Sequence, residues 1–422
     1  MPKLWLLLTV ILSSLFSHLT PQFAAAHTAS PMQLAELTPS TRVTNDWFGL
    51  SVAVSGNTVV VGDFDPNIET YGAVYVYVKP ATGWSNMTQV AKLTSSDNGE
   101  GFGVSVAISG NTIVVGAANT SNFDAPAAGN GATYVFVEPA TGWADATESA
   151  KLTASDGQPG DAFGNSVSLD GSTVAIGAFF ASDSSGNSFA GKAYIFVRPS
   201  TGWSGNLTQT AILTASDSQL LNYMGGSIGV SGNAVVVGAW GHNNFQGAAY
   251  MFVEPSGGWA SMTQTAELTA SDGRGSADFG FSSAISGNTV VIGAPNAANS
   301  LGAAYIFVEP SSGWANMTQG AELHAPNSTQ FDGFGQSAGI VGNAVVIGAP
   351  GAIVGSNSGQ GAAYLFVMPS GGWKNTNQAR KLTASDGAAN DNLGVSASIS
   401  TGTIVAGAPK STTPGSAYVF GP

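Results

Sequence analysis

The chain has 422 residues, of which only 9% are charged, and its formal net charge is −13 at pH 7. A surface that is acidic and carries few charges does not attract the phosphate backbone of nucleic acid. We therefore expect no DNA or RNA partner. The sequence contains no cysteine, which excludes disulfides, thiol nucleophiles and iron–sulfur clusters and leaves packing as the source of stability.

The first 26 residues have the pattern of a secretory signal peptide. Lys3 precedes the apolar run WLLLTVILSSLF, and three alanines at positions 24–26 supply the small residues of a cleavage site. We therefore expect a mature chain that begins near His27, with a short N-terminal segment over residues 27–33. No later stretch has the ~20 apolar residues of a membrane helix. We expect a secreted protein, or one that is periplasmic or associated with the cell surface, without membrane insertion or an anchor of its own.

Residues 34–422 repeat one motif seven times. Each copy has a landmark glycine that follows a large apolar residue, and these positions recur every 54 to 61 residues. The apolar residues are Phe48, Phe102, Phe163, Met224, Phe279, Phe334 and Leu393. A unit of this length fits about four strands with their turns, which is one blade of a β-propeller. The sequence therefore predicts an all-β fold, a seven-bladed β-propeller of four-stranded blades.

The first two strands of a unit differ in pattern. In residues 105–109, serine and alanine share one face and valine and isoleucine share the other, so that the small face suits a crowded central axis. A short Ser-Gly-Asn hairpin, or a variant of it, leads to a second strand such as residues 290–294. That strand is apolar at successive positions, which is typical of a strand covered on both faces.

The second half of a unit is rich in aromatic residues. Tyr305 and Phe307 alternate with smaller apolar residues in the third strand, and their rings are expected to wedge between blades. A Pro-x-x-Gly-Trp turn then leads to a fourth strand such as residues 264–268. The tryptophans of this turn are Trp84, Trp143, Trp203, Trp259, Trp314 and Trp373. Their fixed place after the turn favours structural anchoring over six sugar-binding sites.

The seventh unit ends before a fourth strand, and residues 35–38 match the fourth-strand pattern without a unit before them. The N-terminal strand is therefore expected to complete the last blade. This arrangement closes the ring and removes an exposed sheet edge. A monomer is expected.

These motifs resemble the FG-GAP repeat family, because Phe279-Gly280 is followed by Gly-Ala-Pro at 293–295 and Phe334-Gly335 by Gly-Ala-Pro at 348–350. The resemblance covers residues 34 to 420 and is closest to secreted FG-GAP proteins of bacterial type; the integrin α-subunit head is a better-known relative. Integrin-type units bind calcium in the hairpin between the first two strands with several acidic residues. Asp170 is the sole carboxylate in the seven hairpins here, so these calcium sites are not expected, and no cofactor or metal is predicted.

The second-to-third-strand connections vary most, which is typical of recognition loops on a repeated scaffold. They are expected on the same face as the linkers between units. One of them holds Trp240, His242, Asn243, Asn244 and Phe245, a mixture that suits stacking and hydrogen bonding with a sugar or peptide. The first unit contributes Asp63, Asp65 and Tyr71 as further candidates, and the third loop is rich in phenylalanine. Packing of these loops over the blade ends is the alternative.

The linkers also hold pairs of acidic residues, and the first acid of each pair is expected to cap a turn, with a calcium site as the alternative. The pairs are Asp97 with Glu100, Asp156 with Asp161, Asp272 with Asp278, and Asp386 with Asp391. Asp217 has no such partner nearby in sequence, which favours the structural interpretation.

Catalysis finds little support, because the chain has only four histidines and no compact histidine–carboxylate metal motif. The leading hypothesis is a secreted, non-catalytic interaction module for adhesion or recognition. It would bind an extracellular protein or glycan through the loops of one face. An extracellular polysaccharide hydrolase that uses a loop carboxylate pair and a ligand-free envelope protein are the alternatives.

Overall fold

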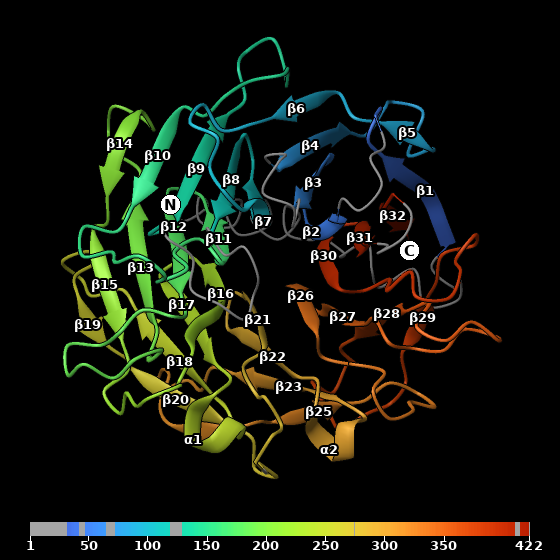
Figure 1. The fold of residues 1–422 in the computed structure, drawn as a ribbon. Coiled ribbons are helices and arrows are strands. Elements are labelled where there is room, and N and C mark those ends of the chain that lie inside the picture. The colour runs from blue at the N-terminus through green and yellow to red at the C-terminus, as the bar shows by residue number, and fades with distance from the viewer. Residues whose placement is uncertain are drawn as a thin grey trace, which may run out of the picture.

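Seven small sheets are arranged in a ring around a central axis in the computed structural model (Figure 1). The structure describes residues 32–41, 47–64, 72–118, 129–273, 275–409 and 414–421. Each sheet is mainly antiparallel and has four or five strands. The predicted all-β, seven-bladed propeller is confirmed.

Blades 1 to 4 follow one another along the chain. Blade 1 contains β2 (Trp47–Ser55), β3 (Thr58–Phe64), β4 (Ala73–Val78) and β6 (Ala91–Leu93). Blade 2 contains β7 (Phe102–Ser109), β8 (Thr112–Ala117), β9 (Ala132–Val137), β10 (Ala150–Thr153) and β14 (Gly205–Thr208). Blade 3 contains β11 (Ser166–Asp170), β12 (Thr173–Ala178), β13 (Lys192–Val197), β15 (Ala211–Thr214) and β19 (Met262–Thr263). Blade 4 contains β16 (Met224–Ser231), β17 (Ala234–Ala239), β18 (Ala248–Val253), β20 (Ala266–Thr269) and β24 (Met317–Thr318).

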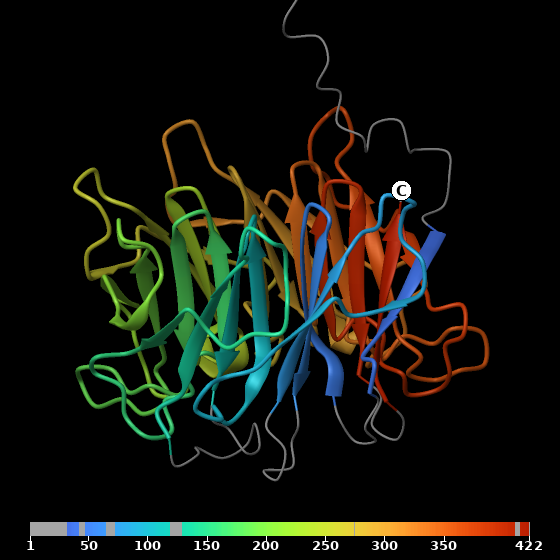
Figure 2. The ribbon, with the colours of Figure 1, turned by 90° about the horizontal axis from the view of Figure 1, so that it is seen from above.

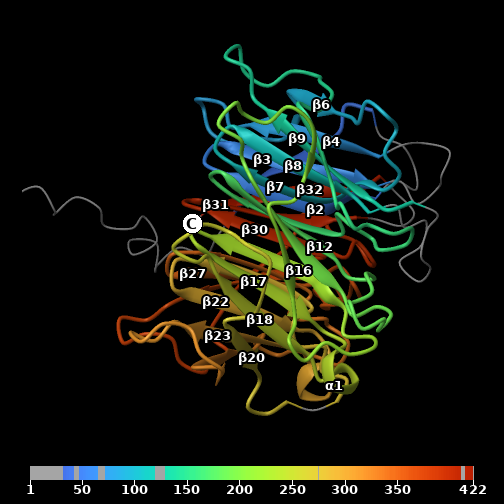
Figure 3. The same ribbon diagram turned by 90° about the vertical axis from the view of Figure 1, so that its left-hand side faces the viewer.

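The remaining blades complete the ring, and Figure 3 shows the blades stacked side by side. Blade 5 contains β21 (Ser282–Ser286), β22 (Thr289–Ala294), β23 (Ala303–Val308) and β25 (Ala321–Leu323). Blade 6 contains β26 (Ser337–Val341), β27 (Ala344–Ala349), β28 (Ala362–Val367) and β29 (Arg380–Leu382). Blade 7 contains β30 (Ser396–Ser400), β31 (Thr403–Ala408), β32 (Ser416–Gly421), β1 (Met32–Thr38) and β5 (Met87–Thr88).

The N-terminal strand closes the ring as predicted. β1 pairs antiparallel with β32, with Leu37 opposite Ala417. It begins at Met32, inside the segment that was expected to precede the domain. Because the first and last segments share one sheet, blade 7 joins the two ends of the array.

Four blades gain a fifth strand that the sequence pattern did not predict. The segment after the tryptophan turn of a later unit runs parallel to the fourth strand of the blade before it, as β24 does beside β20. Side chains reinforce this contact, since Asn316 accepts a hydrogen bond from the Glu267 N–H at 2.8 Å. The added segment covers an edge that would otherwise be open to pairing.

The repeated glycines lie where neighbouring blades come closest. A Cβ atom built on Gly293 would lie 2.1 Å from the carbonyl oxygen of Gly335 in the next blade. That same oxygen accepts a hydrogen bond from Ser282 Oγ at 2.8 Å. The equivalent serine–glycine bond occurs seven times and ends with Ser396 Oγ and the Gly49 oxygen. The glycines of the Phe-Gly and Gly-Ala motifs therefore lie on the two sides of the same contact between neighbouring blades, and this contact recurs around the ring.

The hairpins between first and second strands form a second ring. The two turn residues of the Gly287-Asn288 hairpin separate Ser286 from Thr289, and Gly287 has φ of 57°. The Gly287 N–H donates to Ser231 of the preceding blade at 3.1 Å. Asp170 has the same role, since it accepts from the Gly232 N–H at 2.7 Å. Its carboxylate therefore links two blades.

The core lies between the blades. In the cluster shared by blades 4 and 5, the Phe279 ring packs against Tyr305 and Phe307 at 5.3 and 6.0 Å between centroids. The landmark residues Phe48, Phe102, Phe163, Phe279 and Phe334 are each at most 1% exposed. Trp84, Trp203, Trp259 and Trp314 are buried, and Trp143 and Trp373 are partly buried against core clusters.

Candidate functional site

One face of the ring carries both the second-to-third-strand connections and the linkers between units, and we call it the upper face. In several blades the glycine just before the third strand pairs with the landmark residue of the next unit, as Gly247 does with Phe279 and Gly302 with Phe334. The two short helical turns α1 (His242–Phe245) and α2 (Ala297–Ser300) belong to these connections. Seen edge-on in Figure 2, both turns lie at the same end of the ring.

Six partly exposed aromatic side chains of blades 3 to 5 form a continuous cluster on this face, which we call the aromatic platform. Its members are Phe180, Phe189, Tyr223, Trp240, Phe245 and Phe281. The Tyr223 ring stacks on Trp240 with 4.3 Å between centroids and 9° between planes. Phe180 and Phe189 pack against Tyr223 at 6.0 and 6.2 Å, and Phe245 lies 5.6 Å from Trp240. Four separate chain segments thus contribute to one surface.

The platform reaches the upper mouth of the central channel. Phe281 and Gly226 line this mouth, and a Cβ atom on Gly226 would lie 2.7 Å from Trp240 Nε1. Beneath the platform, buried Phe179 belongs to a cluster with Phe64, against which Tyr223 also packs. The rings therefore rest on the scaffold.

Unusual backbone geometry holds three of these rings in place. Phe189, Tyr223 and Phe245 have φ of 56°, 54° and 63°, a region that costs an L-residue roughly 1–2 kcal/mol. Asn243 and Asn244 precede Phe245 with φ of 50° and 58°, so α1 is a left-handed turn. Asparagine tolerates this conformation, whereas for a bulky aromatic residue it is rare. The same conformation recurs at Asp278 before a landmark residue and at Ser300 in α2, so it belongs to the repeated connections and here carries aromatic side chains.

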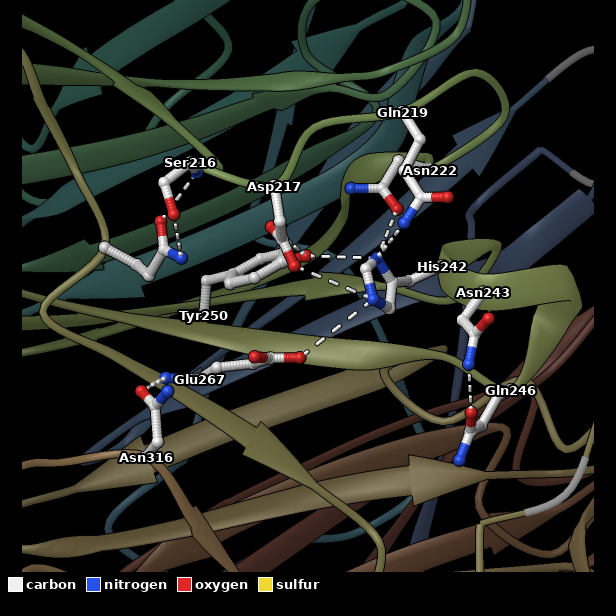
Figure 4. Close-up of polar contacts among 11 residues, drawn as sticks. Ser216, Asp217, Gln219, Asn222, His242, Asn243, Gln246, Tyr250, Glu267 and Asn316 are labelled. Carbon is white, nitrogen blue, oxygen red and sulfur yellow. Dashed lines mark hydrogen bonds and ion pairs between the residues drawn. The ribbon is translucent and has the colours of Figure 1, made fainter.

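The predicted polar residues of this loop have different surroundings. His242 is mostly buried, and its Nδ1 lies 2.8 Å from Oδ1 of fully buried Asn222. Asn243 donates from Nδ2 to Gln246 Oε1 at 2.6 Å, and the side chains of Asn243 and Asn244 are exposed. Figure 4 shows His242 turned toward the linker and β20, and Asn243 turned away from them.

Asp63, the one candidate ligand-binding residue of the first unit that the structure describes, is not part of the platform. Asp63 is buried near the end of β3, opposite Ala73, and Asp65 and Tyr71 lie outside the described residues. The neighbouring Phe64 does pack toward the channel mouth. The sequence analysis therefore chose Asp63, whereas the neighbouring Phe64 lies closer to the candidate site.

Tyr223 and Phe281 are the platform residues that the sequence analysis missed. Both flank a landmark position, since Tyr223 precedes Met224 and Phe281 follows Phe279-Gly280. Among the seven units, only the first and fourth have an aromatic residue just before the landmark, Trp47 and Tyr223. This departure from the repeat could have identified Tyr223 as a candidate from the sequence.

The acidic linker residues have structural partners. In two pairs the first acid accepts from the hydroxyl of a third-strand tyrosine, as Asp97 does from Tyr134 at 2.7 Å and Asp272 from Tyr305 at 3.2 Å. In two pairs the second acid caps the turn, as Asp391 accepts from the Ala388 N–H at 2.6 Å. In those two pairs the turn-capping role belongs to the second acid, whereas it was expected for the first. Burial raises the pKa of the Asp278 carboxyl above its usual range, against the effect of the hydrogen bond from Asn296.

The sequence profile of the FG-GAP repeat matches this chain seven times. The matched residues are 31–77, 87–136, 146–196, 207–252, 262–307, 317–366 and 376–420. No curated protein shows significant similarity to the chain. Within the described residues, no helix is both long and apolar enough to cross a membrane.

Proposed function

Because the chain belongs to the FG-GAP repeat family, we propose that its propeller is a non-catalytic recognition module that binds an extracellular protein through the aromatic platform. The observation that supports this most is the gathering of six partly exposed aromatic rings from four chain segments on one face. A propeller of this family is consistent with a role in recognition.

The chemistry of the platform favours a protein over a glycan. Four of its six rings are phenyl groups without hydrogen-bonding atoms, whereas a sugar needs donors and acceptors beside a stacking ring. Phe245 is 36% exposed, and Leu220 in the adjoining linker is 60% exposed. Exposed aromatic and aliphatic side chains together suit the apolar centre of a protein interface.

The rigidity of the platform supports the same proposal. Left-handed backbone at Phe189, Tyr223 and Phe245 and the packing of Tyr223 on Trp240 fix the rings before a partner arrives. Side chains that are already ordered lose less entropy on binding. The platform would therefore bind without rearranging the blades.

An extracellular location is part of the proposal. The charged, apolar and small-residue segments of residues 1–26 follow the order of a secretory signal. Proteins with FG-GAP repeats are typically extracellular or associated with a surface. Secretion is tested by N-terminal sequencing of the exported chain, which should begin near His27.

The binding experiment uses a phage-displayed random peptide library and a glycan array as probes. The wild-type protein should select peptides rich in apolar residues, and Phe245→Ala should weaken their binding by about 10-fold or more, as a central aromatic contact does. Phe331→Ala is the matched control, because Phe331 is 76% exposed and belongs to the linker before β26. Equal binding by both variants would refute the role of the platform. Selective glycan binding would support a lectin instead, and turnover of a glycan would support the hydrolase.

A further inference from the structure

A group of side chains next to the platform differs from the lysine–aspartate pairs of blades 2 and 3. In blades 2, 4 and 5, a third-strand tyrosine donates its hydroxyl to a linker aspartate. The three pairs are Tyr134 with Asp97, Tyr250 with Asp217, and Tyr305 with Asp272. The tyrosine also lies opposite one residue of the fourth strand in each blade. The charge at this opposite position distinguishes the blades.

In blade 2 the opposite residue is a cation. Lys151 lies across from Tyr134, and its Nζ forms an ion pair with Asp97. In blade 3 a lysine from β13 serves the same purpose, since Lys192 Nζ lies 2.8 Å from Asp156. The linker aspartate of these blades is therefore neutralised by the scaffold itself.

Blade 4 has a negative charge at this position, as blades 5 and 7 do. Glu267 occupies the position of Lys151, across from Tyr250, and Ala248 occupies the position of Lys192. Asp217 thus faces a second carboxylate where blade 2 has a lysine. Burial, followed by the charge of Asp217, raises the pKa of the Glu267 carboxyl. The arrangement calls for a positive charge from another source.

His242 brings a nitrogen between the two carboxylates (Figure 4). Its Nε2 lies 3.7 Å from Asp217 Oδ2 and 4.0 Å from Glu267 Oε1. The three potential ligand atoms all lie within 4.8 Å of one another, and each side chain is partly buried. Both distances from Nε2 are too long for hydrogen bonds. The space between these atoms has the scale of a metal ion.

The other ring nitrogen is held as in a metal site. Asn222 is fully buried and places Oδ1 2.8 Å from His242 Nδ1. An amide oxygen only accepts, so this contact assigns the proton to Nδ1 and leaves the Nε2 lone pair facing the carboxylates. Gln219 Nε2 and the Tyr250 hydroxyl lie farther from Nδ1, at 3.4 and 3.3 Å. Metal-binding histidines are oriented by such a hydrogen bond on their second nitrogen.

We propose that Asp217, His242 and Glu267 form a binding site for a divalent transition-metal ion, with Zn²⁺ as the best match. One imidazole nitrogen and two carboxylates are typical zinc ligands, and a bound water completes a tetrahedron. Bonds of about 2.0–2.2 Å separate tetrahedral ligand atoms by roughly 3.3–3.6 Å. The observed 3.7 and 4.0 Å from His242 Nε2 need a contraction of a few tenths of an ångström, and the two carboxylates, which lie within 4.8 Å of each other, would draw together around the ion. Calcium fits poorly, because it requires six to eight oxygen ligands.

Blade 5 contains the same residue types in a different arrangement. Glu322 corresponds to Glu267, but it has its own histidine, since His324 Nε2 lies 3.0 Å from Glu322 Oε1. This direct contact satisfies the carboxylate without an ion. His324 is therefore a natural control for His242.

The site has a consequence for the loop that carries the platform. His242 lies between Trp240 and Phe245 in sequence, while Asp217 belongs to the preceding linker and Glu267 to β20. A shared ion would tie these three segments together. Metal binding should therefore stabilise residues 240–247 against opening.

The first test is titration of the metal-free, untagged mature chain with ZnCl₂ by calorimetry, with bound metal counted after dialysis. All proteins carry His27→Ala, which removes an N-terminal histidine as a competing ligand. One Zn²⁺ per chain is expected. His242→Ala should weaken binding by more than about 100-fold, beyond the range for an outer-shell partner, and His324→Ala should leave it unchanged. Absence of Zn²⁺ binding to the wild type, or equal losses in both variants, would overturn the proposal.

Glu267→Lys is the more decisive variant, because it recreates the lysine–aspartate pair of blade 2 and should remain folded. It should bind no Zn²⁺, while Asn222→Ala should bind it about 10- to 100-fold more weakly. Zn²⁺ should slow amide hydrogen exchange of residues 240–247 in the wild type and not in Glu267→Lys, and CaCl₂ should have no such effect. Wild-type Zn²⁺ affinity in Glu267→Lys would refute the site. The Zn²⁺-binding experiments can fail while peptide binding succeeds, or the reverse, because peptide binding tests the aromatic platform and not the metal site.

Discussion

Replacement of Gly293 by alanine tests the account of how the blades are joined. The new Cβ atom would lie 2.1 Å from the Gly335 carbonyl oxygen and 2.3 Å from Ser282 Oγ, whereas real Cβ contacts are essentially never shorter than 3.0 Å. Blades 5 and 6 would have to separate by roughly 1 Å, and such overpacking costs about 1–3 kcal/mol. The Ser282–Gly335 hydrogen bond would break as well, at about 1–3 kcal/mol for the buried acceptor. Gly293→Ala should therefore lower the free energy of unfolding by about 2–6 kcal/mol.

The assay is equilibrium urea unfolding followed by circular dichroism and tryptophan fluorescence. Gly257→Ala is the matched control, because a Cβ atom there meets nothing within 4 Å and the backbone is not in the left-handed region. It should change the free energy of unfolding by less than about 0.5 kcal/mol, as surface substitutions do. If Gly293→Ala were as stable as Gly257→Ala, close contact between blades could not be the reason for the repeated glycine.

Three further substitutions test other parts of the structure. Trp259→Ala should cost about 3–5 kcal/mol in urea unfolding, because the ring is buried in the cluster between blades 3 and 4; a loss below about 1 kcal/mol would contradict the anchoring role. Leu37→Ala should cost about 2–5 kcal/mol, since Leu37 is fully buried in β1, and an unchanged urea midpoint would mean that β1 is not part of the cooperative ring. Asp278 has a raised pKa in the folded state because of burial, so its stabilising contribution is present below the unfolded pKa and is lost as pH rises through the folded pKa. Asp278→Asn should make the urea midpoint less dependent on pH above the ordinary aspartate pKa of about 4, and an unchanged pH profile would refute this assignment.

The fold was predictable because each unit repeats its landmark residues in register. The apolar run at residues 290–294 indicates a strand that is buried on both faces, and this information is local in the sequence. The match of residues 35–38 to a fourth strand indicated how the ring closes. The fifth strands could not be predicted in this way. β24 has two residues, and its pairing with β20 depends on a contact between blades that no periodicity within one unit encodes.

The candidate site was predictable in part. The loop with Trp240 and Phe245 was identified from its composition, but its stacking partner Tyr223 lies in a linker that composition did not single out. Asp217 lacked a partner nearby in sequence, yet in the fold it meets His242 and Glu267 from two other segments. Such contacts arise from the blade geometry, which brings the linker, the second-to-third-strand connection and the fourth strand together at one end.

Blade 4 is where the departures from the repeat accumulate. It has Met224 at a position that is phenylalanine in five units, and a tyrosine before it. Drift under structural constraint would spread over seven equivalent units, since each must bury the same faces. Blade 5 repeats the glutamate of blade 4 at Glu322 and its left-handed turn in α2. In blade 4 these features lie beside the stacked rings of Tyr223 and Trp240, which is the pattern expected when one unit of a repeated scaffold carries a functional site.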